Sequence, residues 1–285
     1  TYIRIRNLAI PTVAVEGLSY ISPESLIWSD GRSTISNLTV SAIIHYSPKP
    51  DAERPGQTYM SKVDVDEFHI DRIDAKDIGY EHYEKGLRVN VESGALRDIT
   101  MRALSFELSP DELDDMKIHE DKSRATKDKP TGIHVAAFDD VKVAVAMTNG
   151  LTAKGKLNAS SLDVHFAESG GKEIDLASLT VAEGKVKKGN LDLDVDADVK
   201  GIHVSLLPGG LVKGRAKDVS IGVKGSKGKH SFDAKIDHAD TGEISYDGTF
   251  LDMPALDLPS IKLNSLSVNS PDFGLQIPGG SPAEL

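Results

Sequence analysis

The chain contains no cysteine. Without a thiol it has no disulfide, no thiolate zinc site and no cysteine nucleophile. The usual indication of redox compartment is missing with it, so the sequence leaves the compartment open.

Aromatic residues are scarce, with 7 Phe, 7 Tyr and 1 Trp among 285 residues. Val, Ile, Leu and Ala are abundant instead. A core of small aliphatic side chains suits thin sheet layers better than a bulky globular centre.

Long hydrophobic runs are also missing. The longest, such as IHVAAF and VAVAM, fall far short of the ~20 apolar residues that a membrane-spanning helix needs. The opening TYIRIRNLAI has no signal-peptide pattern. Because the chain starts at Thr1 rather than Met, we expect a mature form or an excised portion of something longer.

Basic residues are fewer than acidic ones: the chain has 33 Lys and Arg and 44 Asp and Glu, which gives a net charge of −11. This balance disfavours nucleic acid and anionic membrane surfaces as general partners. The charge balance therefore predicts no nucleic-acid partner, and the short apolar runs predict no transmembrane segment.

Apolar and polar residues alternate from end to end, as in IRIR, KVDVDEF, LRVNV and VKVAVAM. Period-2 alternation is typical of half-buried strands, and helical periodicity is nearly absent. Turn pairs such as Asn149-Gly150, Gly209-Gly210 and Asp247-Gly248 suit hairpins. The pattern predicts an all-β protein with an extended or curled antiparallel sheet built from repeated hairpins. A two-layer β-sandwich is the alternative.

One short helix is predicted near residues 110–120. Ser109 can cap it, Pro110 suits the first helical position and Glu112 completes a capping box. The stretch DKSRATKDKPTG that follows is charged and predicts an exposed linker. The expected regions are an N-terminal β region at 1–108, the short helix and charged linker at 109–131, and a C-terminal β-repeat region at 132–285.

A weak internal repeat follows the glycines at 155, 184 and 214, which are 29 and 30 residues apart. Apolar residues stand seven and nine positions after each glycine. If the repeat is structural, these positions occupy corresponding strands and form one apolar strip. The candidate ligand-binding strip comprises Leu162, Val164, Leu191, Leu193, Ile221 and Val223.

The stretch NLDLDVDADVK from Asn190 to Lys200 places an aspartate at every second position. Residues two apart in a strand are separated by about 6.6 Å, so the four carboxylates are too widely spaced to hold one ion. Calcium also needs six to eight oxygens drawn into a loop. We interpret the aspartates as the solvated face of a sheet. The opposite apolar face then needs a cover, either a second protein layer or a ligand.

Motifs of catalysis are missing from the sequence. The nine histidines form no HExxH pair, and no G-x-S-x-G, GxxxxGK[ST] or strand-borne G-x-G-x-x-G occurs. Carboxylates are too numerous to single out an acid–base pair. The sequence therefore predicts a non-enzymatic protein without catalytic, cofactor-binding or metal-binding residues and without a cofactor.

Several stretches resemble the AsmA and TamB group of bacterial envelope proteins. They are EFHIDRIDAKDIGY, GKLNASSLDVHF, GKVKKGNLDLDVDADV and LPSIKLNSLSVNSPDFGLQIPGG, within residues 60 to 285. The resemblance lies in the texture of β repeats and has no diagnostic motif. It implies a curled sheet whose concave apolar face carries phospholipid chains between membranes. Such proteins are usually tethered by an N-terminal membrane helix, which this sequence does not contain.

Two main functions stay open. The first is a non-catalytic, elongated β-repeat protein that shields lipid or another apolar ligand along a groove. The second is a structural or interaction module of a surface, secreted or toxin-delivery assembly, in which a protein partner covers the apolar face. A hydrolytic enzyme rests only on the abundant carboxylates. The expected location is the bacterial periplasm or cell envelope, with a secreted or cytoplasmic assembly component as the alternative.

Overall fold

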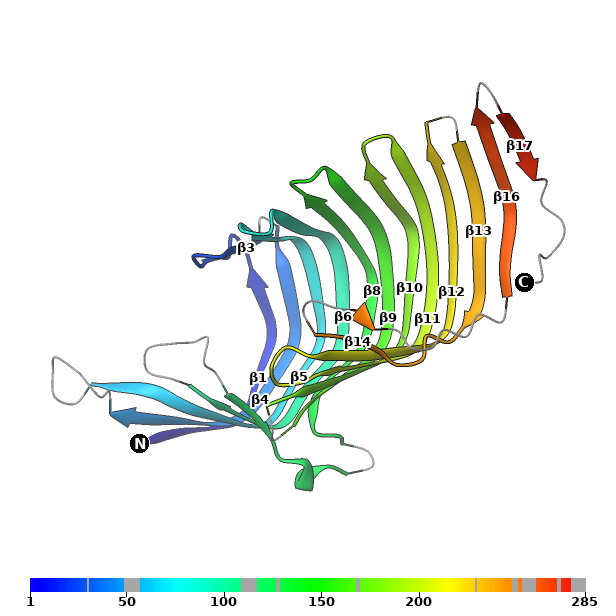
Figure 1. Ribbon diagram of the computed structural model, residues 1–285. Coiled ribbons are helices and arrows are strands. Elements are labelled where there is room, and N and C mark those ends of the chain that lie inside the picture. The colour runs from blue at the N-terminus through cyan, green and yellow to red at the C-terminus, as the bar shows by residue number, and fades with distance from the viewer. Residues whose placement is uncertain are drawn as a thin grey trace.

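A computed structural model describes residues 1–29, 31–48, 57–108, 117–126, 129–167, 170–228, 230–247, 251–252, 260–270 and 273–277. Most of these residues lie in the strands of one large open antiparallel sheet (Figure 1). The prediction of an all-β protein with an extended or curled antiparallel sheet is confirmed. The alternative of a two-layer sandwich is wrong, because the described strands belong to a single sheet.

The strands are long and follow one another closely along the chain. Their bounds are β1 Tyr2–Val15, β2 Ser19–Ile21, β3 Ser25–Ser29, β4 Ser33–Pro48, β5 Thr58–His82, β6 Leu87–Glu107, β7 Lys117–Glu120, β8 Gly132–Met147, β9 Leu151–Phe166, β10 Lys172–Lys188, β11 Leu191–Leu206, β12 Val212–Lys227, β13 His230–Ala239, β14 Ile244–Tyr246, β15 Leu251–Asp252, β16 Ser260–Ser270 and β17 Phe273–Ile277.

Strand pairing follows chain order from β8 to β13 and then passes to β16 and β17. At the N-terminal side, β1 pairs with β4, and β4 and β3 share one edge of β5. β6 pairs with β5 and then with β8, from Leu87 opposite Met147 to Arg102 opposite Gly132. The sheet is therefore continuous past the predicted linker at 109–131.

The last four residues of the helix predicted near residues 110–120 are not helical. Residues Lys117–Glu120 form strand β7, which pairs with the last residues of β6, Leu104 to Glu107. That part of β6 extends beyond the start of β8 and offers a free edge, so tertiary pairing wins over the local helix signal. Residues 109–116 lie outside the described residues. The described helical turn is a short 3-10 segment, Lys122–Arg124, capped by Asp121.

Alternation along the strands is interrupted at regular intervals. In β5 the cross-strand register puts these residues on one face: Val63, Val65, Phe68, Ile70, Ile73, Ala75, Ile78 and Tyr80. Within each pair the apolar residues are two positions apart, but three positions separate one pair from the next, so the alternation shifts by one residue. The slip keeps the apolar side chains on the same face where the strand bends.

The bends coincide with residues of positive φ. Asn37 in β4, Asp98 in β6 and Ser161 in β9 have φ of 53°, 49° and 50°, and Gly201 in β11 has 59°. The pairing registers place these residues on one line across the sheet. Asn, Asp and Gly tolerate this backbone region better than other residues. The line forms a crease across the sheet, and Figure 1 shows the long strands bending part-way along their length.

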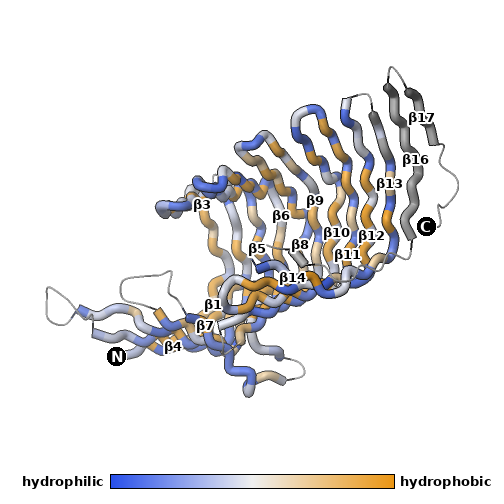
Figure 2. The backbone as a smooth tube through the Cα atoms, in the orientation of Figure 1, coloured by the Kyte–Doolittle hydropathy of each residue, from blue (hydrophilic) through white to orange (hydrophobic). Residues whose placement is uncertain are grey.

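A cluster of buried aliphatic side chains lies beside this crease. Ile70, Ile99 and Val135 are only 4%, 6% and 5% exposed, and Leu38 and Phe138 pack against them. In a sheet of one layer, side chains reach such burial on the inside of a bend, where both halves of the strands approach them. The apolar face is therefore the concave face at the crease. Figure 2 shows hydrophobic and hydrophilic residues alternating along the bent strands.

The hairpin repeat has a different period from the predicted one. β9 and β11 begin 40 residues apart, at Leu151 and Leu191, and β10 and β12 also begin 40 residues apart. The glycines at 155, 184 and 214 fall in β9, β10 and β12. Their 29- and 30-residue spacing does not match a structural unit.

Candidate functional site: the concave apolar face

Three apolar rows cross the sheet beside the crease, with one residue from each successive strand. Row 1 consists of Val13, Ile35, Ile73, Leu96, Phe138, Ala159, Leu179, Val199, Val219 and Ala239. Row 2, on the other side of the crease, consists of Ile10, Leu38, Ile70, Ile99, Val135, Leu162, Leu176 and Ile202. Row 3 consists of Leu8, Val40, Phe68, Met101, Ile133, Val164, Ile174 and Val204. The rows form an apolar surface that continues from strand to strand.

No second layer covers these rows among the described residues. Nearly all contacts between strands are contacts between hydrogen-bonded neighbours. The largest exception is a small contact between β7 and β9, which are not paired. The side chains of the rows are therefore sheltered by their neighbours and by the bend. Many remain only half-buried, including Leu38, Leu162 and Leu176. This surface can accept an apolar ligand along the crease.

The six predicted strip residues all lie on the apolar face and are all half-buried. Leu162 belongs to row 2 and Val164 to row 3. Val223 is opposite Val195, and Ile221 is opposite Ala197. Leu162, Val164, Ile221 and Val223 have apolar pairing partners on both sides, whereas Leu191 lies opposite Lys188 and Lys227.

The structure does not bring the six residues into one strip. Leu193 is opposite Val186, which is opposite Ala153 in β9. Ala153 and Leu162 are nine positions apart in that strand, or about 30 Å of extended chain. Ile221 lies at an intermediate level. The predicted residues are therefore spread along the strands, while rows 1 to 3 run across them.

The opposite face carries the aspartates of β11. Lys187 contacts Asp192 at 2.7 Å and Lys185 contacts Asp194 at 2.8 Å, both across the β10–β11 pair. The hydrogen bond and the charge of Lys185 lower the pKa of the Asp194 carboxyl. A hollow of about 930 Å³ crosses this face from β10 to β13. The interpretation of the aspartates as an outward polar face is consistent with this arrangement.

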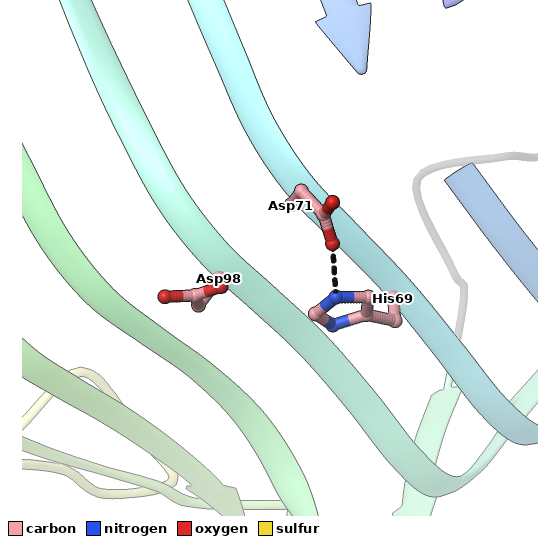
Figure 3. A group of neighbouring side chains, drawn as sticks. All are labelled: His69, Asp71 and Asp98. Carbon is pink, nitrogen blue, oxygen red and sulfur yellow. Dashed lines mark hydrogen bonds and ion pairs between the residues drawn. The ribbon is translucent and has the colours of Figure 1, made fainter. Parts of the chain in front are cut away.

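One group of possible metal ligands lies on the polar side of the crease. Ligand atoms of His69, Asp71 and Asp98 lie within 4.8 Å of one another. His69 and Asp71 come from β5 and Asp98 from β6, and Figure 3 shows the hydrogen bond of 2.7 Å between His69 Nε2 and Asp71. Asn37 Nδ2 donates to the other Asp71 oxygen at 2.6 Å. Both Asp71 oxygens are thus engaged by protein, and the sequence spacing gave no signal for this grouping because it depends on the β5–β6 register.

A buried carboxylate ties β7 to the start of β8 and the end of β9. The Glu120 side chain is 0% exposed and accepts hydrogen bonds from Thr131 Oγ1 at 2.5 Å, the Phe166 backbone N–H at 2.8 Å and His165 Nδ1 at 3.0 Å. Burial raises the pKa of Glu120, but these hydrogen bonds outweigh it, so the pKa lies below its ordinary value. Each donor supports the charged form, so the arrangement is a structural anchor.

No protein-family model, curated protein or solved structure matches this chain. Within the described residues, no helix is both long and apolar enough to cross a membrane.

Proposed function

We propose that the protein is a non-catalytic groove protein that shields the acyl chains of lipid along its concave apolar face. The observation that supports this proposal is the continuity of rows 1 to 3 on the inner side of a bend that no second protein layer covers within the described residues.

The energetics favour an acyl chain as the occupant. Each methylene group moved from water into an apolar environment contributes about 0.8 kcal/mol. Aliphatic side chains without fixed hydrogen-bonding groups accept such a chain in many positions along the rows. A ligand that requires directional recognition would need polar groups among them, and rows 1 to 3 contain aliphatic, aromatic and Met side chains only.

The outer face supports the same function. Ion pairs such as Lys185–Asp194, Lys156–Asp140 and Arg72–Asp74 occupy that face. A sheet with one charged and one apolar side keeps water on the outside and the ligand on the inside. This arrangement agrees with the AsmA and TamB resemblance, and a bacterial-envelope location is part of the proposal.

The first experiment tests the occupant directly. The purified protein is extracted with organic solvent and the extract is analysed by mass spectrometry, in parallel with ultraviolet crosslinking of variants that carry a photoreactive residue. We expect acyl chains to be captured at Leu162 in row 2 and at Leu193 farther along the same face. The matched control is Thr152, which is exposed on the opposite face of β9.

Capture of lipid at Thr152 as well would indicate nonspecific association and contradict the groove. Lipid-free protein whose Leu162 and Leu193 probes crosslink only to protein would favour the structural or interaction module instead.

A further inference from the structure

The outer edge of β1 has no strand paired with it in the described part of the chain. β1 is hydrogen-bonded to β4 on its other side. Tyr2, Ile3 and Leu8 are 63%, 51% and 45% exposed. Among the described residues, rows 1 to 3 extend as far as this strand, at Val13, Ile10 and Leu8. A long apolar edge strand presents unpaired backbone groups and is a template for pairing with another strand.

The apolar positions of β1 form a palindrome around Ala9. They are Ile3, Ile5, Leu8, Ile10, Val13 and Val15. If two β1 strands pair antiparallel with Ala9 opposite Ala9, every apolar residue meets another apolar residue: position 3 meets 15, position 5 meets 13, and position 8 meets 10. The twofold axis is then perpendicular to the sheet, so both concave faces lie on the same side.

The polar residues fit the same register. Arg4 is then opposite Ala14 and Arg6 opposite Thr12, so no like charges face each other. Asn7, with φ 48°, is opposite Pro11, which itself lies at the level of the crease. A shift by two residues in one direction puts Ile5 opposite Pro11, and a shift in the other direction puts Leu8 opposite Thr12. The palindromic register is the best matched of the three.

We propose that β1 pairs with β1 of a second copy of this chain, so that two sheets join edge to edge into one continuous groove. Rows 2 and 3 of one copy continue into rows 3 and 2 of the other, through Ile10 opposite Leu8. Pairing through the outer edge of β1 does not depend on which ligand the groove holds, so this proposal is independent of the proposed function.

Because the chain has no cysteine, single-cysteine variants test the register cleanly. Opposed residues of an antiparallel pair have Cα atoms about 4.5–5.5 Å apart, within the range that disulfides span. We expect Ala9→Cys to form a disulfide-linked dimer on mild oxidation. Arg4→Cys alone should form none, because its two copies would be about 33 Å apart. Mixing Arg4→Cys with Ala14→Cys should restore crosslinking, and all three positions are exposed.

Two charge variants test the dimer without crosslinking. Ala9→Lys places two ammonium groups opposite each other across the twofold axis and should weaken dimerisation in analytical ultracentrifugation severalfold. Thr12→Glu places a carboxylate opposite Arg6 of the second copy and should strengthen dimerisation severalfold. Circular dichroism of both variants serves as the control that they keep the fold.

A chain that stays monomeric at high micromolar concentration and gives no Ala9→Cys dimer would overturn the proposal. Equal crosslinking by Arg4→Cys alone, or the same shift in dimerisation from both charge variants, would also overturn it, because neither outcome depends on the register.

Discussion

Replacing Asp98 with valine tests whether positive-φ residues form the crease. Asp98 lies on the crease in β6 with φ 49°, and its side chain is exposed. An L-residue in this region costs about 1–2 kcal/mol relative to ordinary strand geometry, and Asp reduces that cost by local hydrogen bonding. β-Branched valine has no such compensation. We therefore expect Asp98→Val to lower the free energy of unfolding by about 1–2 kcal/mol.

Two companion variants separate backbone strain from loss of the carboxylate. Asp98→Gly removes the same carboxylate but tolerates positive φ, so we expect stability equal to the original or higher by up to ~1 kcal/mol. Asp196→Val makes the same exchange at an exposed position of β11 that is not among the residues of positive φ. Its stability should stay within about 0.5 kcal/mol of the original.

Urea unfolding provides the measurement. Trp28 is the one tryptophan of the chain. It lies against Arg88, whose guanidinium is 5.0 Å from the ring centroid, so its fluorescence reports the loss of the β3–β5–β6 region. If Asp98→Gly destabilises the protein as much as Asp98→Val, the effect comes from the lost carboxylate and the strain argument fails. Equal losses from Asp98→Val and Asp196→Val would refute it as well.

Two further substitutions test other contacts of the fold. Gly79→Ala should destabilise the protein by about 1–3 kcal/mol in the same unfolding assay, because a Cβ at Gly79 would overlap the Trp28 ring. Gly222→Ala should be nearly neutral, because a Cβ there meets no atom within 4 Å. Equal effects of the two substitutions would contradict this packing. The lowered pKa of Glu120 means that its carboxylate stabilises the fold above the unfolded-state pKa of 4.5 and that this contribution is lost as the pH falls through the lower folded-state pKa. The stability difference between the original protein and Glu120→Gln should therefore be constant near neutral pH and shrink below about pH 4.5, and a difference independent of pH from 7 to 3 would contradict the assignment.

Part of the crease could have been predicted from the sequence. In VDVDEFHIDRIDAKDIGY the apolar residues of β5 recur in pairs separated by one residue, with two polar residues between pairs. A strict period of two misses this slip, although Asp and Asn at the interruptions are the residue types that tolerate positive φ. The same slip occurs in β10, at Leu176 to Leu179 and Val181 to Gly184. The slip predicts bends, but one strand alone does not show that the bends align.

The local signal at 109–120 illustrates the opposite case. A capping box and a suitable proline predicted a helix, yet the end of that segment pairs with β6 as β7. Hydrogen bonds to an available strand edge, together with the Glu120 contacts to Thr131 and Phe166, outweigh a short isolated helix, which is marginal on its own.

The sequence by itself determined the fold class, the assignment of faces and the charged outer surface, because these follow from the alternation of side chains along each strand. The tertiary structure decided which residues share a row. Hairpin length and bulges set the register, so residues with near-equal offsets from the repeated glycines, such as Leu162 at seven and Leu193 at nine positions, lie about 30 Å apart along the strands. The concave apolar face likewise exists only after pairing, since the bend of each strand becomes a crease when neighbouring strands place their bends at the same level.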